Sequence, residues 1–216
     1  MASGTWQWQW QWQWQWQWQC RNAAAAVLGL WACCALSQER YQIDPQHTFS
    51  TFEYEHWGLS LQRGRFDGNS GSILFDPVGR RGEIAVSIAT GSVSTGTPLF
   101  DAILRSPEFF DAAAHPVITF RSTALHFDGE RLVSVDGNLS IKGTIRSVTL
   151  TMTRFNCRFM LMYGKRACGA NGYARLSRSD FDLGRYVPFV SDAVTLYVSV
   201  EAIQDPIREP EAVSLR

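Results

Sequence analysis

Histidine and cysteine are the side chains of this chain best suited to chemistry, and both are scarce. The 216 residues include four histidines and five cysteines. Covalent catalysis requires a nucleophile beside a base, and a metal centre requires several converging ligands. His47 and His56 lie nine residues apart, and this odd spacing turns them to opposite faces of one strand. They cannot both ligate one metal without help from loops, so we predict no metal site and no catalytic residue.

Among the four histidines, His56 is the best placed to meet the polar end of a bound molecule. It is in phase with Phe52 and Tyr54 of the same predicted strand, so the three side chains share one face. For His115, which precedes a proline, and for His126 we expect structural or surface roles. No sequence pattern favours an enzyme.

Two of the five cysteines are expected to form a disulfide. Cys157 and Cys168 are separated by ten residues with no histidine near them, whereas a zinc site needs about four ligands. In an oxidising compartment such a pair is typical of a disulfide that pins a hairpin loop. A redox-active pair is the alternative, but the CxxC spacing is absent. Farther along, Arg178, followed by Ser-Asp-Phe, is expected to lock a loop at a strand end rather than to form a surface ion pair.

Residues 1–37 are expected to stand apart from the folded domain. Residues 6–19 repeat Trp-Gln without interruption, which is typical of low-complexity sequence or of a start codon placed too early; an aromatic membrane anchor is the alternative. The apolar run of 14 residues at 23–36 suits a signal-peptide core and is short for a bilayer span. We expect cleavage before Gln38, with a lipoprotein-type cut before Cys33 as the rival. The mature protein would be periplasmic or secreted, without a membrane span.

The overall composition excludes two classes of protein. The chain has 20 Lys+Arg and 20 Asp+Glu, so its formal net charge is zero, which argues against a strongly basic nucleic-acid binder. Hydrophobic residues make up 45% and charged residues 19%, which argues against a highly charged disordered protein.

Alternation of apolar and polar residues dominates the chain from residue 38 onward, and this period of two indicates strands with one dry face. We predict eight strands, near residues 42–57, 62–76, 82–95, 116–127, 131–141, 146–161, 169–178 and 192–203. Residues 97–112 break the pattern. There Thr97 is suited to an N-cap and Pro98 to the first helical position, and a second short helix is expected to begin at Ser106.

Eight antiparallel strands can close into a barrel, which removes exposed strand edges. We therefore predict an all-β, eight-stranded antiparallel barrel with a short helical insert near residues 97–112. The interior of such a barrel is either filled or holds one small ligand, and the apolar inward set implies an apolar ligand. The side chains expected to line this interior are Phe52, Tyr54, His56, Phe75, Ile84, Val86, Ile88, Ile118, Phe120, Val133, Val135, Leu150, Met152, Leu196 and Val198.

Several short motifs follow one another in an order that resembles the YceI-like family of exported, lipocalin-like barrels. They cover about residues 40–204 and include Tyr41-Gln42-Ile43-Asp44-Pro45, Gly64-Arg65-Phe66, Leu104-Arg105-Ser106, Gly137-Asn138-Leu139-Ser140-Ile141-Lys142-Gly143-Thr144, Cys168-Gly169-Ala170 and Arg178-Ser179-Asp180-Phe181. The resemblance assigns residues 38–204 to the barrel domain and leaves 205–216 as a C-terminal tail. Many family members carry polar residues and histidine where this chain has Leu99, Phe100 and Ile103, so the insert is more apolar here.

The resemblance implies a lipocalin-like barrel that holds an isoprenoid chain, such as a polyprenyl phosphate or a quinone tail, with no other cofactor. Our interpretation is an exported protein that carries or sequesters this lipid and has no reaction of its own. One alternative is a filled barrel that acts as a structural or stress-related interaction protein. Another is a lipid-modifying enzyme. The sequence also leaves a homodimer open.

Overall fold

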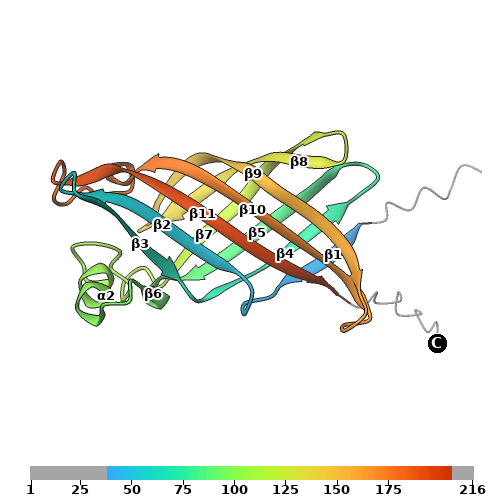
Figure 1. Ribbon diagram of the computed structural model, residues 1–216, viewed down its shortest axis with the longest axis horizontal. Coiled ribbons are helices and arrows are strands. Elements are labelled where there is room, and N and C mark those ends of the chain that lie inside the picture. Colours follow the sequence, from blue (N-terminus) through green and yellow to red (C-terminus); the bar gives the residue numbers. More distant parts are fainter. Residues whose placement is uncertain (1–37, 206–216) are drawn as a thin grey trace, which may run out of the picture. The chain divides into compact units, whose positions relative to one another are not determined.

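The computed structural model describes residues 38–205 (Figure 1). The predicted Trp-Gln tract and signal peptide, and residues 206–216 of the predicted tail, lie outside this range. Within it the chain forms eleven strands and one α-helix, in the order β1 (Glu39–Ile43), β2 (Phe49–His56), β3 (Ser60–Phe66), β4 (Asn69–Asp76), β5 (Arg81–Ala89), β6 (Val93–Ser94), α2 (Pro98–Arg105), β7 (Val117–Asp128), β8 (Arg131–Ile141), β9 (Thr144–Met160), β10 (Lys165–Ser177) and β11 (Val190–Gln204).

The eleven strands form one closed antiparallel barrel. β1 pairs with both β4 and β11, which joins the two ends of the sheet. β2 pairs with β11 and β3, so β1 and β2 are two halves of one wall element, and β3 with β4 and β5 with β6 form two more. Counted this way the barrel has eight wall elements, which confirms the predicted all-β, eight-stranded antiparallel fold. The predicted strands at 42–57, 62–76 and 82–95 are each interrupted once.

A buried asparagine repairs two of these interruptions. The carbonyl of Phe66, at the end of β3, and that of Thr48, just before β2, lie where strand pairing is interrupted. Each therefore needs a donor other than a neighbouring strand. The Asn69 side-chain amide donates to the carbonyls of Phe66 (2.7 Å) and Thr48 (3.0 Å), and its oxygen accepts from the Ser50 hydroxyl (2.7 Å). Asn69 is 1% exposed, so these bonds are made away from water.

Two glycines allow aromatic rings to lie flat against the inside of the wall. Gly64 lies opposite Phe52 on the neighbouring strand, and Gly137 lies beside Phe120. A Cβ atom at either glycine would overlap the ring, so only glycine leaves room for these side chains.

The helical insert differs from the prediction in its second half. Thr97 precedes α2 and Pro98 begins it, as predicted, but the Thr97 side chain makes no capping bond. Residues 107–110 form turns rather than a second short helix, because the amides of Phe109 and Asp111 both return to the carbonyl of Ser106. This turn directs Phe110 into the barrel, where its ring packs against Phe66 at 5.3 Å between centroids.

The predicted disulfide is present in the β9–β10 hairpin. Cys157 and Cys168 lie directly opposite each other on the two strands and are bonded. They clamp the hairpin on the strand side of its turn, residues 161–164. Among the described residues, no helix has the length and apolar character needed to cross a bilayer.

Candidate functional site

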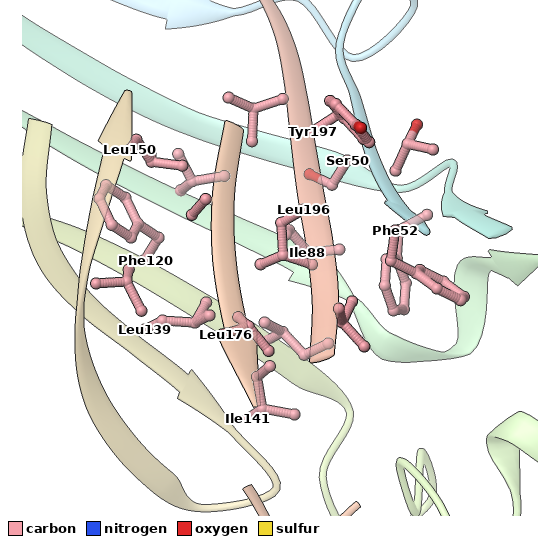
Figure 2. A pocket seen from close by; sticks show the side chains of 18 of the residues that line it. Ser50, Phe52, Ile88, Phe120, Leu139, Ile141, Leu150, Leu176, Leu196 and Tyr197 are labelled. Atoms are coloured by element: carbon pink, nitrogen blue, oxygen red, sulfur yellow. The ribbon is translucent and has the colours of Figure 1, made fainter. Parts of the chain in front are cut away.

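The barrel encloses an apolar cavity of about 530 Å³. Its walls come from every part of the sheet: Ile88 on β5, Leu139 on β8, Leu176 on β10 and Leu196 on β11 point toward one common space (Figure 2). This volume falls within the range of about 300–1,000 Å³ that is typical of small-molecule pockets. The barrel is therefore hollow rather than filled.

The cavity brings together most of the side chains that the alternation predicted. Fourteen of the fifteen line it, namely Phe52, Tyr54, His56, Phe75, Ile84, Val86, Ile88, Ile118, Phe120, Val135, Leu150, Met152, Leu196 and Val198. That these residues contact a ligand stays a prediction. The cavity also includes residues that were not predicted to line it, among them Leu132, Leu139, Ile141, Leu104 and Phe110.

Val133 is the residue that does not line the cavity, and a β-bulge explains the departure. Phe127 pairs with Leu132 while His126 pairs with Ser134, so Val133 is an extra residue in β8. The bulge shifts the phase of the strand and points both Leu132 and Val135 inward, with exposures of 4% and 1%. Simple alternation, which places Val133 and Val135 on one face, is wrong at this point. Leu139 and Ile141 lie at even spacing from Val135 and so share its face of β8, whereas no periodic pattern marks Leu104 or Phe110.

One end of the cavity is closed by aromatic rings. Phe75, Phe127 and Phe155 pack around one another with centroid separations of 5.9–6.4 Å. Tyr41 lies on β1 at the same end, is 1% exposed and donates its hydroxyl hydrogen to Glu39. Burial raises the pKa of Tyr41. No lining residue at this end of the described barrel is exposed.

The other end is the mouth. The exposed side chains among the cavity lining gather there, from the adjoining ends of β2 and β3, from α2 and from the β10–β11 loop. They are His56, Gln62, Phe100, Ile103, Arg185 and Tyr186. Tyr197, on the barrel wall, is the exception. Figure 1 shows α2, the β2–β3 turn and the β10–β11 loop at this end of the barrel. His56, which was predicted to meet a polar ligand end, is therefore at the mouth.

Arg178 holds the loop that forms one side of this mouth. It is 8% exposed, and its guanidinium donates to the carbonyls of Ser191 (2.8 Å), Arg185 (2.7 Å), Val190 (2.9 Å) and Leu183. This is the predicted loop lock rather than a surface ion pair. Burial lowers the pKa of Arg178, and the nearby Asp192 carboxylate opposes this shift.

The remaining titratable groups do not form a reactive cluster. His47 bonds to Asp44 and His126 bonds to Asp136, both at 2.7 Å and both at the surface. The hydrogen bond from Asp44 raises the pKa of His47. No aspartate or glutamate lines the cavity, and within residues 38–205 no three potential metal ligands converge. The site is arranged to hold an apolar molecule, with polar groups confined mainly to its mouth.

Comparison with known proteins agrees with this arrangement. A family model described as the YceI-like domain matches residues 41–202. Protein YceI of Salmonella arizonae is 34% identical over 167 residues, which cover 76% of this chain and 86% of that protein. The solved YceI protein of Campylobacter jejuni is 25% identical with a TM-score of 0.59, over 70% of this chain and 90% of that chain. A solved polyisoprenoid binding domain from Saccharophagus degradans, implicated in plant cell wall breakdown, is 18% identical with a TM-score of 0.59, over 76% of this chain and 98% of that chain.

The motifs that suggested this family thus lie within the matched segment, and the barrel that they form is the fold of its solved members. The chain belongs to the YceI-like domain family.

Proposed function

We propose that the protein is an exported barrel that carries or sequesters an isoprenoid-type lipid, with the tail along the apolar interior and the head at the mouth. The observation that carries this proposal is the apolar cavity, which runs from an exposed, partly polar mouth to a closed aromatic end. The fold that the chain shares with the polyisoprenoid binding domain of S. degradans supports it.

The energetics favour an apolar tail in this site. Each methylene group removed from water contributes roughly 0.8 kcal/mol, and the lining offers almost no polar partner that would compensate a hydrophilic ligand. A filled structural barrel, the first alternative, would leave no cavity of about 530 Å³.

Export is part of the proposal, and two features support it. The sequence of residues 23–36 suits a signal peptide, and the chain carries a disulfide between Cys157 and Cys168. Disulfides persist in oxidising compartments such as the periplasm or the exterior of the cell. N-terminal sequencing of the protein recovered from outside the cytoplasm tests this step, and a chain that still begins at Met1 would contradict it.

Organic extraction followed by mass spectrometry tests the binding proposal and identifies the head group. Protein is purified without detergent from bacteria that make polyprenyl lipids and quinones. We expect one isoprenoid-type lipid for each chain. An extract without stoichiometric lipid, from protein that also fails to bind an added isoprenoid alcohol, would refute the carrier function and favour the structural alternative.

Substitution of His56 separates a carrier from the lipid-modifying enzyme. In a carrier, His56→Ala removes one polar contact at the mouth, so most of the bound lipid is retained. In an enzyme that used His56 as its base, the same change would abolish turnover of the extracted lipid. We expect wild-type protein and His56→Ala to return the same lipid, chemically unchanged after incubation.

A further inference from the structure

We propose that the mouth of the barrel docks directly onto a phospholipid bilayer, through an apolar rim formed by Trp57, Leu59, Leu99, Phe100, Tyr186 and Phe189. These side chains are between 53% and 85% exposed. The inference rests on the proposed lipid-carrying function, because it concerns the route by which the lipid enters the cavity.

Contacts between three separate segments make the rim one continuous surface. The rings of Trp57 and Phe189 stack at 4.6 Å, and the Trp57 amide donates to the Phe189 carbonyl at 2.7 Å, which joins the β2–β3 turn to the β10–β11 loop. The loop is joined to the helical insert by the ion pair between Arg185 and Glu108, at 2.9 Å. Phe100 and Tyr186 belong to the rim and also line the cavity, so the cavity opens through this surface.

The α2 helix leaves most of its apolar surface exposed, although Leu104 packs against the barrel core. A surface helix normally buries its apolar stripe against the core. None of the eight residues of α2 is buried, and Leu99, Phe100 and Ile103 are 66%, 53% and 39% exposed. An apolar surface of this kind is explained if lipid covers it when the protein loads or releases its ligand.

Ion pairs offset most of the charge beside the rim, and the exposed Glu55, which forms no ion pair within residues 38–205, adds a negative charge. Arg63 bonds to Glu53 at 2.6 Å and Lys142 bonds to Asp182 at 3.0 Å, in addition to the pair between Arg185 and Glu108. Because these charges offset each other, the rim has no strong preference for anionic head groups. We therefore infer that it inserts into zwitterionic phosphatidylcholine, and that salt does not weaken the docking.

The function of the mouth favours a bilayer over a second copy of the chain as the occupant of the rim. A second copy bound there would cover the opening through which the ligand must pass. A bilayer is itself the source of the lipid, and contact with it spares the apolar tail a passage through water that costs roughly 0.8 kcal/mol for each methylene. Tryptophan and tyrosine side chains are suited to the membrane–water interface.

The opposite end of the barrel supplies an internal control. There the β9–β10 turn exposes Leu161 and Met162, which are 90% and 82% exposed. Arg158, Lys165 and Arg166 flank them, with no acidic residue between positions 157 and 168. Docking through this hairpin would depend on anionic lipid and on low salt, in contrast to docking through the rim.

Hydrogen–deuterium exchange of the full chain, with and without phosphatidylcholine vesicles, tests the proposal and localises the contact even if residues 1–37 also bind lipid. We expect slower exchange in residues 57–61, 98–104 and 185–190 and no change in residues 158–165, at low and at high salt. Protection of the hairpin alone, or of neither end, overturns the proposal. Protection of the rim without vesicles, rising with protein concentration together with a dimer mass, overturns it in favour of a second copy.

Matched variants connect docking to lipid transfer. Leu59→Ser with Leu99→Ser alters two rim residues that do not line the cavity, and Leu161→Ser with Met162→Ser makes the same kind of change at the other end. We expect the rim variant to slow transfer of a pyrene-labelled isoprenoid alcohol from phosphatidylcholine vesicles by at least about tenfold, because it removes two side chains that would enter lipid. The amount bound at equilibrium should be unchanged, and the hairpin variant should transfer at the wild-type rate.

The outcomes distinguish this inference from the proposed function. If extraction recovers lipid but the rim is not protected and the rim variant transfers normally, the docking proposal fails and the carrier function stands. If the rim is protected but the protein neither contains nor binds isoprenoid lipid, the carrier function fails, and the docking proposal, which depends on it, fails as a route of lipid entry.

Discussion

At the scale of single residues, Arg178 shows how one side chain can define the mouth of the barrel. Its four backbone acceptors lie on residues 183–191, so the loop is held by one guanidinium rather than by a strand ladder. Arg178→Met keeps the apolar stem but removes the donor from one buried carbonyl, that of Leu183, and from three partly buried ones. We expect the free energy of unfolding, measured in urea, to fall by about 1–3 kcal/mol.

The neighbouring surface residue Arg175 provides the control for this change. It is exposed near the end of β10, three residues before Arg178, so Arg175→Met should alter the unfolding free energy by less than about 0.5 kcal/mol. Equal stability of the two variants would show that Arg178 does not lock the loop.

Asp192 makes the same region sensitive to pH. It accepts hydrogen bonds from the Ser179 hydroxyl (2.7 Å) and amide (2.8 Å), and chiefly the hydroxyl bond lowers the pKa of Asp192 below its ordinary value of 3.8. A carboxyl whose pKa is lower in the folded state contributes stability above its unfolded-state pKa and loses it as the pH falls through its folded-state pKa. We expect Asp192→Asn to be less stable than wild type at about pH 7, and the difference to shrink toward about pH 2. A difference that is constant over this range in urea unfolding would contradict the assignment.

At the scale of elements, the strands follow from alternation, whereas their interruptions do not. The period of two predicts β7 to β11 because those strands are long and turn their side chains alternately toward the barrel interior and solvent over most of their length. The separation of β3 from β4 depends on Asn69, whose partners include residues about twenty positions away, and no local pattern reports such a partner. The bulge at Val133 is likewise a property of pairing with β7 rather than of the β8 sequence.

The β9–β10 hairpin depends on its disulfide for part of its stability. The bond closes a short loop, with a sequence separation of 11 residues between Cys157 and Cys168. In the chain-entropy model, a loop of this size gives a stabilisation of about 3 kcal/mol. We expect Cys157→Ala with Cys168→Ala to lower the free energy of unfolding by about this amount. A reductant should lower the free energy of unfolding of the wild-type protein but not that of the double variant. An unfolding free energy of the wild-type protein that does not change with reductant would contradict a stabilising disulfide.

At the scale of the whole molecule, the closed barrel could be predicted from the sequence but its hollow interior could not. Eight strands are compatible with a filled interior and with a ligand cavity. The outcome depends on how far side chains reach across the barrel, and here Phe52 and Phe120 lie back against Gly64 and Gly137 instead of crossing the centre. The entry of Leu104 and Phe110 from the insert was not predictable either, because Leu104 extends from α2 and Phe110 from the turn at residues 107–110, outside the alternating strands.

Native mass spectrometry of two variants tests most directly the claim that the interior holds a lipid. Ala174 lines the cavity on β10 and is 3% exposed, so Ala174→Phe places a ring in the path of the tail. Ala193 on β11 is exposed, so Ala193→Phe adds the same ring outside. We predict that the wild-type protein and Ala193→Phe are detected with the added mass of one isoprenoid-type lipid. Folded Ala174→Phe should be detected at the mass of the protein alone. Equal lipid occupancy in all three proteins, or none in any of them, would contradict lipid binding in the barrel cavity.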